Sequence, residues 1–131
     1  MGLQDRNKRG FSRLLRSFGY ASEGLKHVFF YEQNMQIHIS LSVVVVLLGA
    51  WLDVSRIEWL IILLVISGIF SLEIMNTAIE RTVDLVTEEY HPIAKRAKDV
   101  AASAVFVYSV FAVIIGLVLF IPYILEKLSS L

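Results

Sequence analysis

The chain has 131 residues, of which 56% are hydrophobic. Its mean hydropathy of +0.68 is too high for a soluble domain and predicts a single membrane-embedded domain over residues 1–131. Twelve acidic residues balance twelve Lys and Arg residues, and the lack of cysteine excludes disulfides and thiolate chemistry.

The N-terminal part divides into two segments. Residues 1–10 are polar, and we expect them to be flexible. From Phe11 onward, the spacing of aromatic and basic residues predicts an amphipathic helix over residues 11–30 that lies in the membrane interface. Arg13 and Tyr20 fall on its polar face and could instead contact a phosphate group. This helix is therefore either a plain anchor or part of a site.

Three stretches can span a membrane as helices, namely residues 33–52, 57–87 and 93–125. The uncharged core of the second runs only from Trp59 to Leu72, so this helix must continue through Glu73 with that side chain facing protein or water. Pro92 suits the first turn of the last helix, and we expect Pro122 to end it. Lys and Arg gather before the first span and between the second and third, which predicts a cytoplasmic N-terminus and an outer C-terminus.

A stripe of polar residues follows one face of the second span. At 100° per residue, this face carries Glu73, Asn76, Thr77, Glu80, Asp84 and Thr87. A charged carboxylate at the bilayer centre costs roughly 2.5 to 3.5 kcal/mol, so acids near lipid are functional candidates by default. Glu32 precedes the first span and should lie at a similar depth, because the two helices are antiparallel.

The residue types suit a divalent cation and a polyphosphate. Mg²⁺ is commonly held by one or two carboxylates plus substrate phosphates, and Glu32 and Glu80 could supply them. Lys98 could hold phosphate charge, and Glu73 could deprotonate an acceptor hydroxyl. The seven glycines form no phosphate-binding loop of the P-loop type, and no protein-kinase motifs occur, which excludes a standard nucleotide fold.

Three interpretations remain open on residue types alone. The chain could be a membrane enzyme that handles phosphates, a proton or cation pathway lined by Glu73, Glu80 and Asp84, or a structural membrane subunit. The acids collect at one cytoplasmic end, whereas an ion pathway favours acids spread through the bilayer. This distribution favours the enzyme.

The sequence also carries a family resemblance. Glu73-Ile-Met-Asn-Thr-Ala-Ile-Glu80, followed by Val83-Asp84, Glu89-Tyr90-His91 and Arg96-Ala97-Lys98-Asp99, resembles the signature of the prokaryotic membrane diacylglycerol kinase family. The resemblance covers nearly the whole chain. Its flanking segments, such as His91-Pro92-Ile93-Ala94-Lys95, are similar to the Gram-positive branch, whose members act as undecaprenol kinases.

The resemblance implies an all-α membrane protein, a homotrimer of three-span subunits in the bacterial cell membrane, with its active site on the cytoplasmic side. It implies transfer of the γ-phosphate of MgATP to undecaprenol, with diacylglycerol as the alternative acceptor. The Gram-negative members have an acid where this chain has His38. A prenol offers one hydroxyl and no ester carbonyl groups, so a site with fewer polar lipid contacts would suit it.

The roles of individual residues are implied position by position. Glu73 matches the catalytic base of the family, and Glu32 and Glu80 match its metal ligands. The positions that match nucleotide-binding residues are Arg13, Tyr20, Glu32, Glu80, Glu89, His91, Lys98 and Asp99. Asn76 and Asp84 match further polar positions of the active site.

Overall fold

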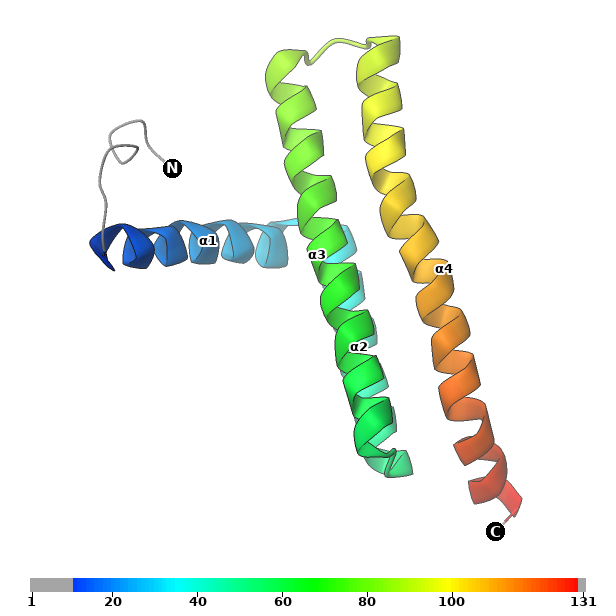
Figure 1. Ribbon diagram of the computed structural model, residues 1–131. Coiled ribbons are helices and arrows are strands. Elements are labelled where there is room, and N and C mark those ends of the chain that lie inside the picture. Colours follow the sequence, from blue (N-terminus) through cyan, green and yellow to red (C-terminus); the bar gives the residue numbers. More distant parts are fainter. Residues whose placement is uncertain (1–10, 130–131) are drawn as a thin grey trace.

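The computed structural model describes residues 11–129, and these residues form helices joined by short connections (Figure 1). The helices are α1 (Phe11–Tyr31), α2 (Gln33–Leu52), α3 (Arg56–Val86) and α4 (Pro92–Ser129). The all-α class predicted from the sequence is confirmed for this part of the chain. Residues 1–10, which we expect to be flexible, lie outside the described residues.

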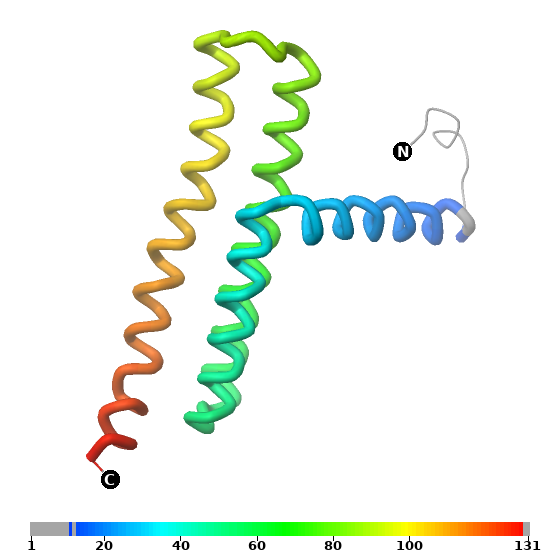
Figure 2. Tube along the Cα trace, turned by 180° about the vertical axis from the view of Figure 1, so that it is seen from behind, coloured from blue at the N-terminus to red at the C-terminus, as the bar shows by residue number. Residues whose placement is uncertain are grey.

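Helices α2, α3 and α4 are each long and apolar enough to cross a membrane. Helix α2 has 20 residues and is therefore about 30 Å long, which matches the hydrocarbon core of a bilayer. With 31 and 38 residues, α3 and α4 are longer, and their shared end projects beyond the level of α1 (Figures 1 and 2). Helix α3 continues through Glu73 without a break.

Helix α1 lies crosswise to the long helices and extends away from them to one side (Figure 2). The chain changes direction at Glu32, the single residue between α1 and α2, whose backbone is extended at φ −97° and ψ 118°. Phe29 packs edge-to-face on Phe70 of α3, with ring centroids 5.8 Å apart. This contact sets the level of α1 along α3 at about one turn before Glu73.

The connection between α2 and α3 is a tight, capped turn. Asp53 adopts a left-handed conformation at φ 55°, and the Ser55 hydroxyl and the Glu58 carboxylate form a capping box at the start of α3. The hydroxyl of Tyr123 donates to Oε2 of Glu58 at 2.6 Å, and the Lys127 ammonium donates to the carbonyl of Trp51 at 3.1 Å. The last turns of α4 are thereby tied to this connection.

Helix α4 does not end at Pro122, so that expectation was wrong. The helix passes through the proline and ends at Ser129. Proline removes one backbone donor, but membrane helices tolerate this where neighbouring groups support the chain. Tyr123 and Lys127, which lie one and five residues after the proline, make the contacts to α3 and to Trp51, and these contacts hold the helix in register beyond it.

Gly68 of α3 lies directly against the side chain of Tyr108 on α4. A Cβ atom placed on Gly68 would lie 1.9 Å from the hydroxyl oxygen of Tyr108, so any larger residue would require the tyrosine side chain to move. The same hydroxyl donates to the carbonyl of Leu64 at 3.2 Å. The tyrosine therefore has a hydrogen-bond partner although it lies within an apolar helix pair.

Candidate active site

The polar stripe on α3 begins with three buried polar side chains. Glu73, Asn76 and Thr77 expose only 2%, 4% and 5% of their surface. Oε2 of Glu73 and Oδ1 of Asn76 are buried acceptors without a hydrogen-bond partner among the described residues. Leaving such acceptors unpaired costs free energy, and a donor that enters the site would relieve this cost.

Glu73 faces a polar surrounding built by two helices. Asn34 and His38 of α2 lie beside its carboxyl group, and the carboxylates of Glu32 and Glu80 are near enough to act on its charge. The structure therefore brings together Glu32 from the start of α2 with Glu73 and Glu80 from α3. These three acids are candidates for proton and metal chemistry.

Asn76 links the buried part of the stripe to the next acid. Its Nδ2 donates to Oε1 of Glu80 at 3.0 Å, which orients the half-buried carboxylate of Glu80. Oε2 of Glu80 does not take part in this hydrogen bond. The arrangement offers one carboxylate oxygen for a cation while the other is held by the amide.

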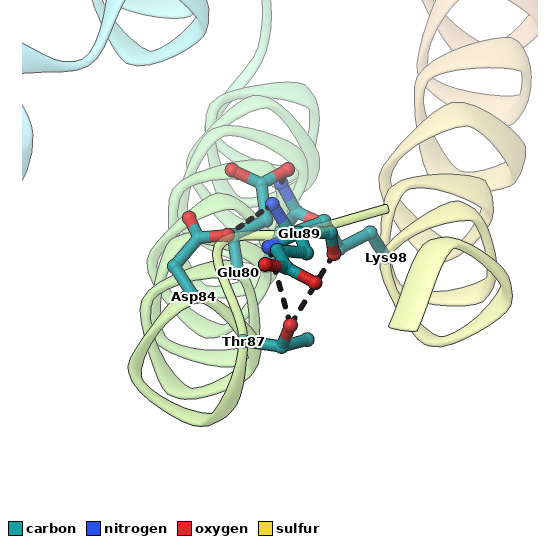
Figure 3. Close-up of polar contacts among 6 residues, drawn as sticks. Glu80, Asp84, Thr87, Glu89 and Lys98 are labelled. Carbon is teal, nitrogen blue, oxygen red and sulfur yellow. Dashed lines mark hydrogen bonds and ion pairs between the residues drawn. The ribbon is translucent and has the colours of Figure 1, made fainter. Parts of the chain in front are cut away.

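The projecting end of α3 and α4 carries ion pairs that involve several predicted site residues. Lys98 reaches across from α4 to Asp84 on α3 (Figure 3), and Lys95 pairs with Asp99 within α4. In the connection between the helices, Oγ1 of Thr87 accepts from the backbone N–H of Glu89 at 3.2 Å. These contacts place Lys98, Asp99 and Glu89 around one end of the hairpin.

A cleft of about 400 Å³ opens between the same helix ends. Its lining includes Val83, Thr87, His91 and Ala94. Nδ1 of His91 accepts from the backbone N–H of Ile93 at 3.3 Å, so the imidazole is held at the first turn of α4. His91 therefore lies beside a concave surface rather than on an open face of the hairpin.

The structure of the single chain does not bring Arg13 and Tyr20 to the other predicted residues. Arg13 lies near the start of α1, at the end remote from the long helices (Figure 1). Tyr20 lies near the middle of α1. Because α1 leads away from α3 and α4, the predicted nucleotide contacts fall into two separate places on one chain.

The carboxylates present fit a cation that brings other ligands with it. No group of three or more His, Cys, Asp or Glu side chains able to hold a metal ion occurs within residues 11–129. Glu32 and Glu80 can still each supply one carboxylate oxygen. Mg²⁺ is usually bound in this way, by one or two carboxylates together with substrate phosphates.

Arg81 is a site residue that the sequence analysis missed. Its Nη2 donates to Oε1 of Glu32 at 2.6 Å and so joins α3 to the start of α2. The polar stripe does not include Arg81, because this residue is about 100° away from Glu80 around the helix. No signal in the sequence could have found this pairing, because it depends on how α2 is rotated relative to α3.

An apolar cavity of about 430 Å³ extends between the long helices. His38 and Ser42 line it at the level of the acids, and Phe120 and Ile124 line it toward the far end. The Ser42 hydroxyl donates to the carbonyl of His38 at 2.7 Å, so its hydrogen is directed away from the cavity. The cavity is therefore almost entirely apolar and begins near Glu73.

Comparison with known proteins identifies the family. The family model described as "Prokaryotic diacylglycerol kinase" matches residues 19–120. The chain belongs to this family. The matched segment contains every predicted site residue except Arg13, and the kinase is accordingly a multi-pass membrane protein and an ATP-dependent phosphotransferase that acts on lipids.

Individual relatives of this lipid kinase differ in their named substrates. This chain is 46% identical to an undecaprenol kinase of Bacillus subtilis over 116 residues, which cover 88% of this chain and 94% of the relative. It is 39% identical to a diacylglycerol kinase of Synechocystis over 114 residues, 86% of this chain and 65% of the relative. A diacylglycerol kinase of Escherichia coli K12 is 32% identical over 108 residues, 82% of this chain and 88% of the relative.

Proposed function

We propose that this lipid kinase transfers the γ-phosphate of MgATP to undecaprenol on the cytoplasmic side of the bacterial cell membrane. The observation that carries the proposal is the buried, unpartnered acceptor Oε2 of Glu73, which lies close to the level where α1 meets α3. At this level a lipid hydroxyl from the membrane and a phosphate group from the cytoplasm can meet. Diacylglycerol is the alternative acceptor.

Glu73 is proposed to act as the general base. Its free Oε2 accepts the proton of the lipid hydroxyl as the hydroxyl oxygen attacks the γ-phosphorus. The bond from that phosphorus to the bridging oxygen of ADP breaks, and ADP leaves. Asn76 holds Glu80 and presents its own Oδ1 to the same space, so it helps to orient the hydroxyl.

Glu32 and Glu80 are proposed as the protein ligands of Mg²⁺. When bound there, the ion would neutralise phosphate charge during transfer. Glu80 is pre-oriented by Asn76, and Glu32 sits at the turn between α1 and α2. Both carboxylates flank Glu73, so phosphates held by them would be near the base.

The nucleotide is proposed to bind at the end of the α3–α4 hairpin. Four of the predicted nucleotide-binding residues lie there, namely Lys98, Glu89, His91 and Asp99. When the nucleotide binds, Lys98 would exchange its ion pair with Asp84 for contacts with phosphate oxygens. Arg13 and Tyr20 complete the nucleotide site if α1 of a neighbouring subunit supplies them, which is consistent with the homotrimer that the family resemblance implies. Helix α1 would then serve as both a membrane anchor and a ligand-binding element.

The proposed membrane position follows from the exposed surfaces. Helix α1 exposes large apolar side chains that would enter the membrane interface, among them Phe11, Leu14, Leu15 and Phe18. The acids Glu80 and Asp84 lie beyond α1 along α3, on the aqueous side of this interface. The distribution of Lys and Arg supports a cytoplasmic location for this side.

This orientation predicts which positions react with a membrane-impermeant thiol reagent. Because the chain has no cysteine, each introduced cysteine is the only reactive thiol. We expect Ser55→Cys and Ser129→Cys to be labelled from outside intact cells, whereas Glu88→Cys should be labelled only after lysis. Labelling of just one of the two outer positions would show that the three-span topology is wrong.

The substrate is tested by assaying undecaprenol and diacylglycerol in parallel with purified protein and MgATP. We expect kcat/KM to be higher for undecaprenol by about tenfold or more, because the apolar cavity beginning at His38 and Ser42 suits an isoprenoid chain without ester groups. His38→Glu should narrow this difference by adding a polar group near the lipid headgroup. His27→Glu makes the same change on α1 and should leave the preference unaltered. Equal or greater activity on diacylglycerol in the unmodified protein favours the alternative.

A further inference from the structure

The ion pair between Arg81 and Glu32 connects α3 to a proposed metal ligand. The Nη2–Oε1 distance is 2.6 Å, so the guanidinium takes up one of the two carboxylate oxygens of Glu32 and neutralises its charge. The side chain of Glu32 is 19% exposed, whereas that of Arg81 is 62% exposed. The acid is therefore confined, and its basic partner can leave by rotating into water.

Further acids surround Arg81. Besides Glu32, the carboxylates of Glu80 and Asp84 lie close enough to interact with its charge. The guanidinium thus sits among two proposed metal ligands and a neighbouring active-site acid. A divalent cation attracted by the same carboxylates would be repelled by a guanidinium charge that stayed in place.

We propose that Arg81 and a divalent cation are alternative partners of Glu32, so that Arg81 sets the cation affinity of the site. The inference rests on the proposed role of Glu32 as a metal ligand. While Arg81 holds Oε1 of Glu32 and neutralises the charge of the carboxylate, Glu32 attracts a cation less strongly, and this competition weakens the binding of the metal alone. A metal that arrives with phosphates overcomes the competition more readily, because the phosphates supply additional ligands.

The proposal predicts a gain of metal binding when the arginine is removed. The experiment uses full-length protein in lipid nanodiscs without nucleotide, with Mn²⁺ as the only divalent cation, and measures free Mn²⁺ by electron paramagnetic resonance. We expect Arg81→Ala to bind Mn²⁺ about three- to tenfold more tightly than the unmodified protein, because a partly exposed ion pair is weak. Arg81→Lys, which retains the charge, should stay closer to the unmodified protein.

Two variants control for charge and for the ligand. Arg56→Ala removes the same charge from the other end of α3, about 37 Å away, and should not change Mn²⁺ binding. Glu32→Gln should weaken Mn²⁺ binding and abolish the effect of Arg81→Ala in the double variant. Because Arg81 is exposed and its ion pair contributes little to folding, Arg81→Ala should retain the thermal midpoint of the unmodified protein.

The outcomes separate this inference from the proposed function. If Glu32→Gln weakens Mn²⁺ binding but Arg81→Ala leaves it unchanged or weaker, the competition is wrong and the metal role of Glu32 stands. If Mn²⁺ binding does not respond to Glu32→Gln, both the metal role and the competition are overturned. Tighter binding in Arg81→Ala that persists in the double variant also overturns the competition, since it would not act through Glu32.

Discussion

Replacing Glu73 by Gln is expected to lower kcat by about 10² to 10⁴, the usual effect of losing a general base, while MgATP still binds. The amide keeps the shape of the carboxyl group in a position where only 2% of the residue is exposed. It cannot accept the proton of the lipid hydroxyl. The loss should therefore appear in the chemical step, measured as kcat at saturating MgATP and lipid.

Binding and folding are checked separately for this variant. MgATP should protect Glu73→Gln against heat and proteolysis as it protects the unmodified protein. Glu73→Asp retains a base but withdraws it by one methylene group, so its kcat should fall between those of the other two proteins. A Glu73→Gln protein that no longer binds MgATP, or that keeps most of its kcat, would show that the base has been assigned to the wrong residue.

Replacing Glu80 by Gln should raise the Mg²⁺ concentration needed for half-maximal rate. The side-chain carbonyl of Gln can still accept the hydrogen bond from Nδ2 of Asn76, so the change removes mainly the ligand charge. We expect an increase of about 100-fold, the upper end of what is lost when a residue that supports a metal ligand is removed. The measurement is the initial rate as a function of Mg²⁺ at constant ATP.

Glu88→Gln provides the matched control for Glu80→Gln. Glu88 is an exposed acid in the connection between α3 and α4, and it is not among the predicted ligands. Its replacement removes the same charge from the same end of the molecule and should leave the Mg²⁺ requirement unaltered. If both variants raise the Mg²⁺ requirement equally, Glu80 acts through the overall electrostatic field of the site rather than as a metal ligand.

Helical periodicity was enough to predict which face of α3 turns inward. The stripe that begins at Glu73 contains Asn76 and Thr77, and all three are buried. This succeeds because a polar side chain next to lipid must face protein or water, so pattern and burial are linked. The pairing of Arg81 with Glu32 was out of reach, since it depends on how α2 is rotated relative to α3.

Two other features depend on contacts between distant parts of the chain. The expected helix end at Pro122 followed a local rule, and the bonds of Tyr123 and Lys127 to residues before and within α3 override that rule. The direction of α1 depends on the backbone of one residue, Glu32. Helical periodicity carries no information on the direction of α1. The positions of Arg13 and Tyr20 relative to the α3–α4 hairpin could therefore not be predicted from the sequence.

The close approach at Gly68 constrains how this sequence can diverge. A side chain at position 68 must push the ring of Tyr108 aside unless the tyrosine has already been replaced by a smaller residue. The reverse order is open, because losing Tyr108 first removes a hydrogen bond to Leu64 but creates no clash. The less costly order is thus the one in which the substitution in α4 precedes the one in α3.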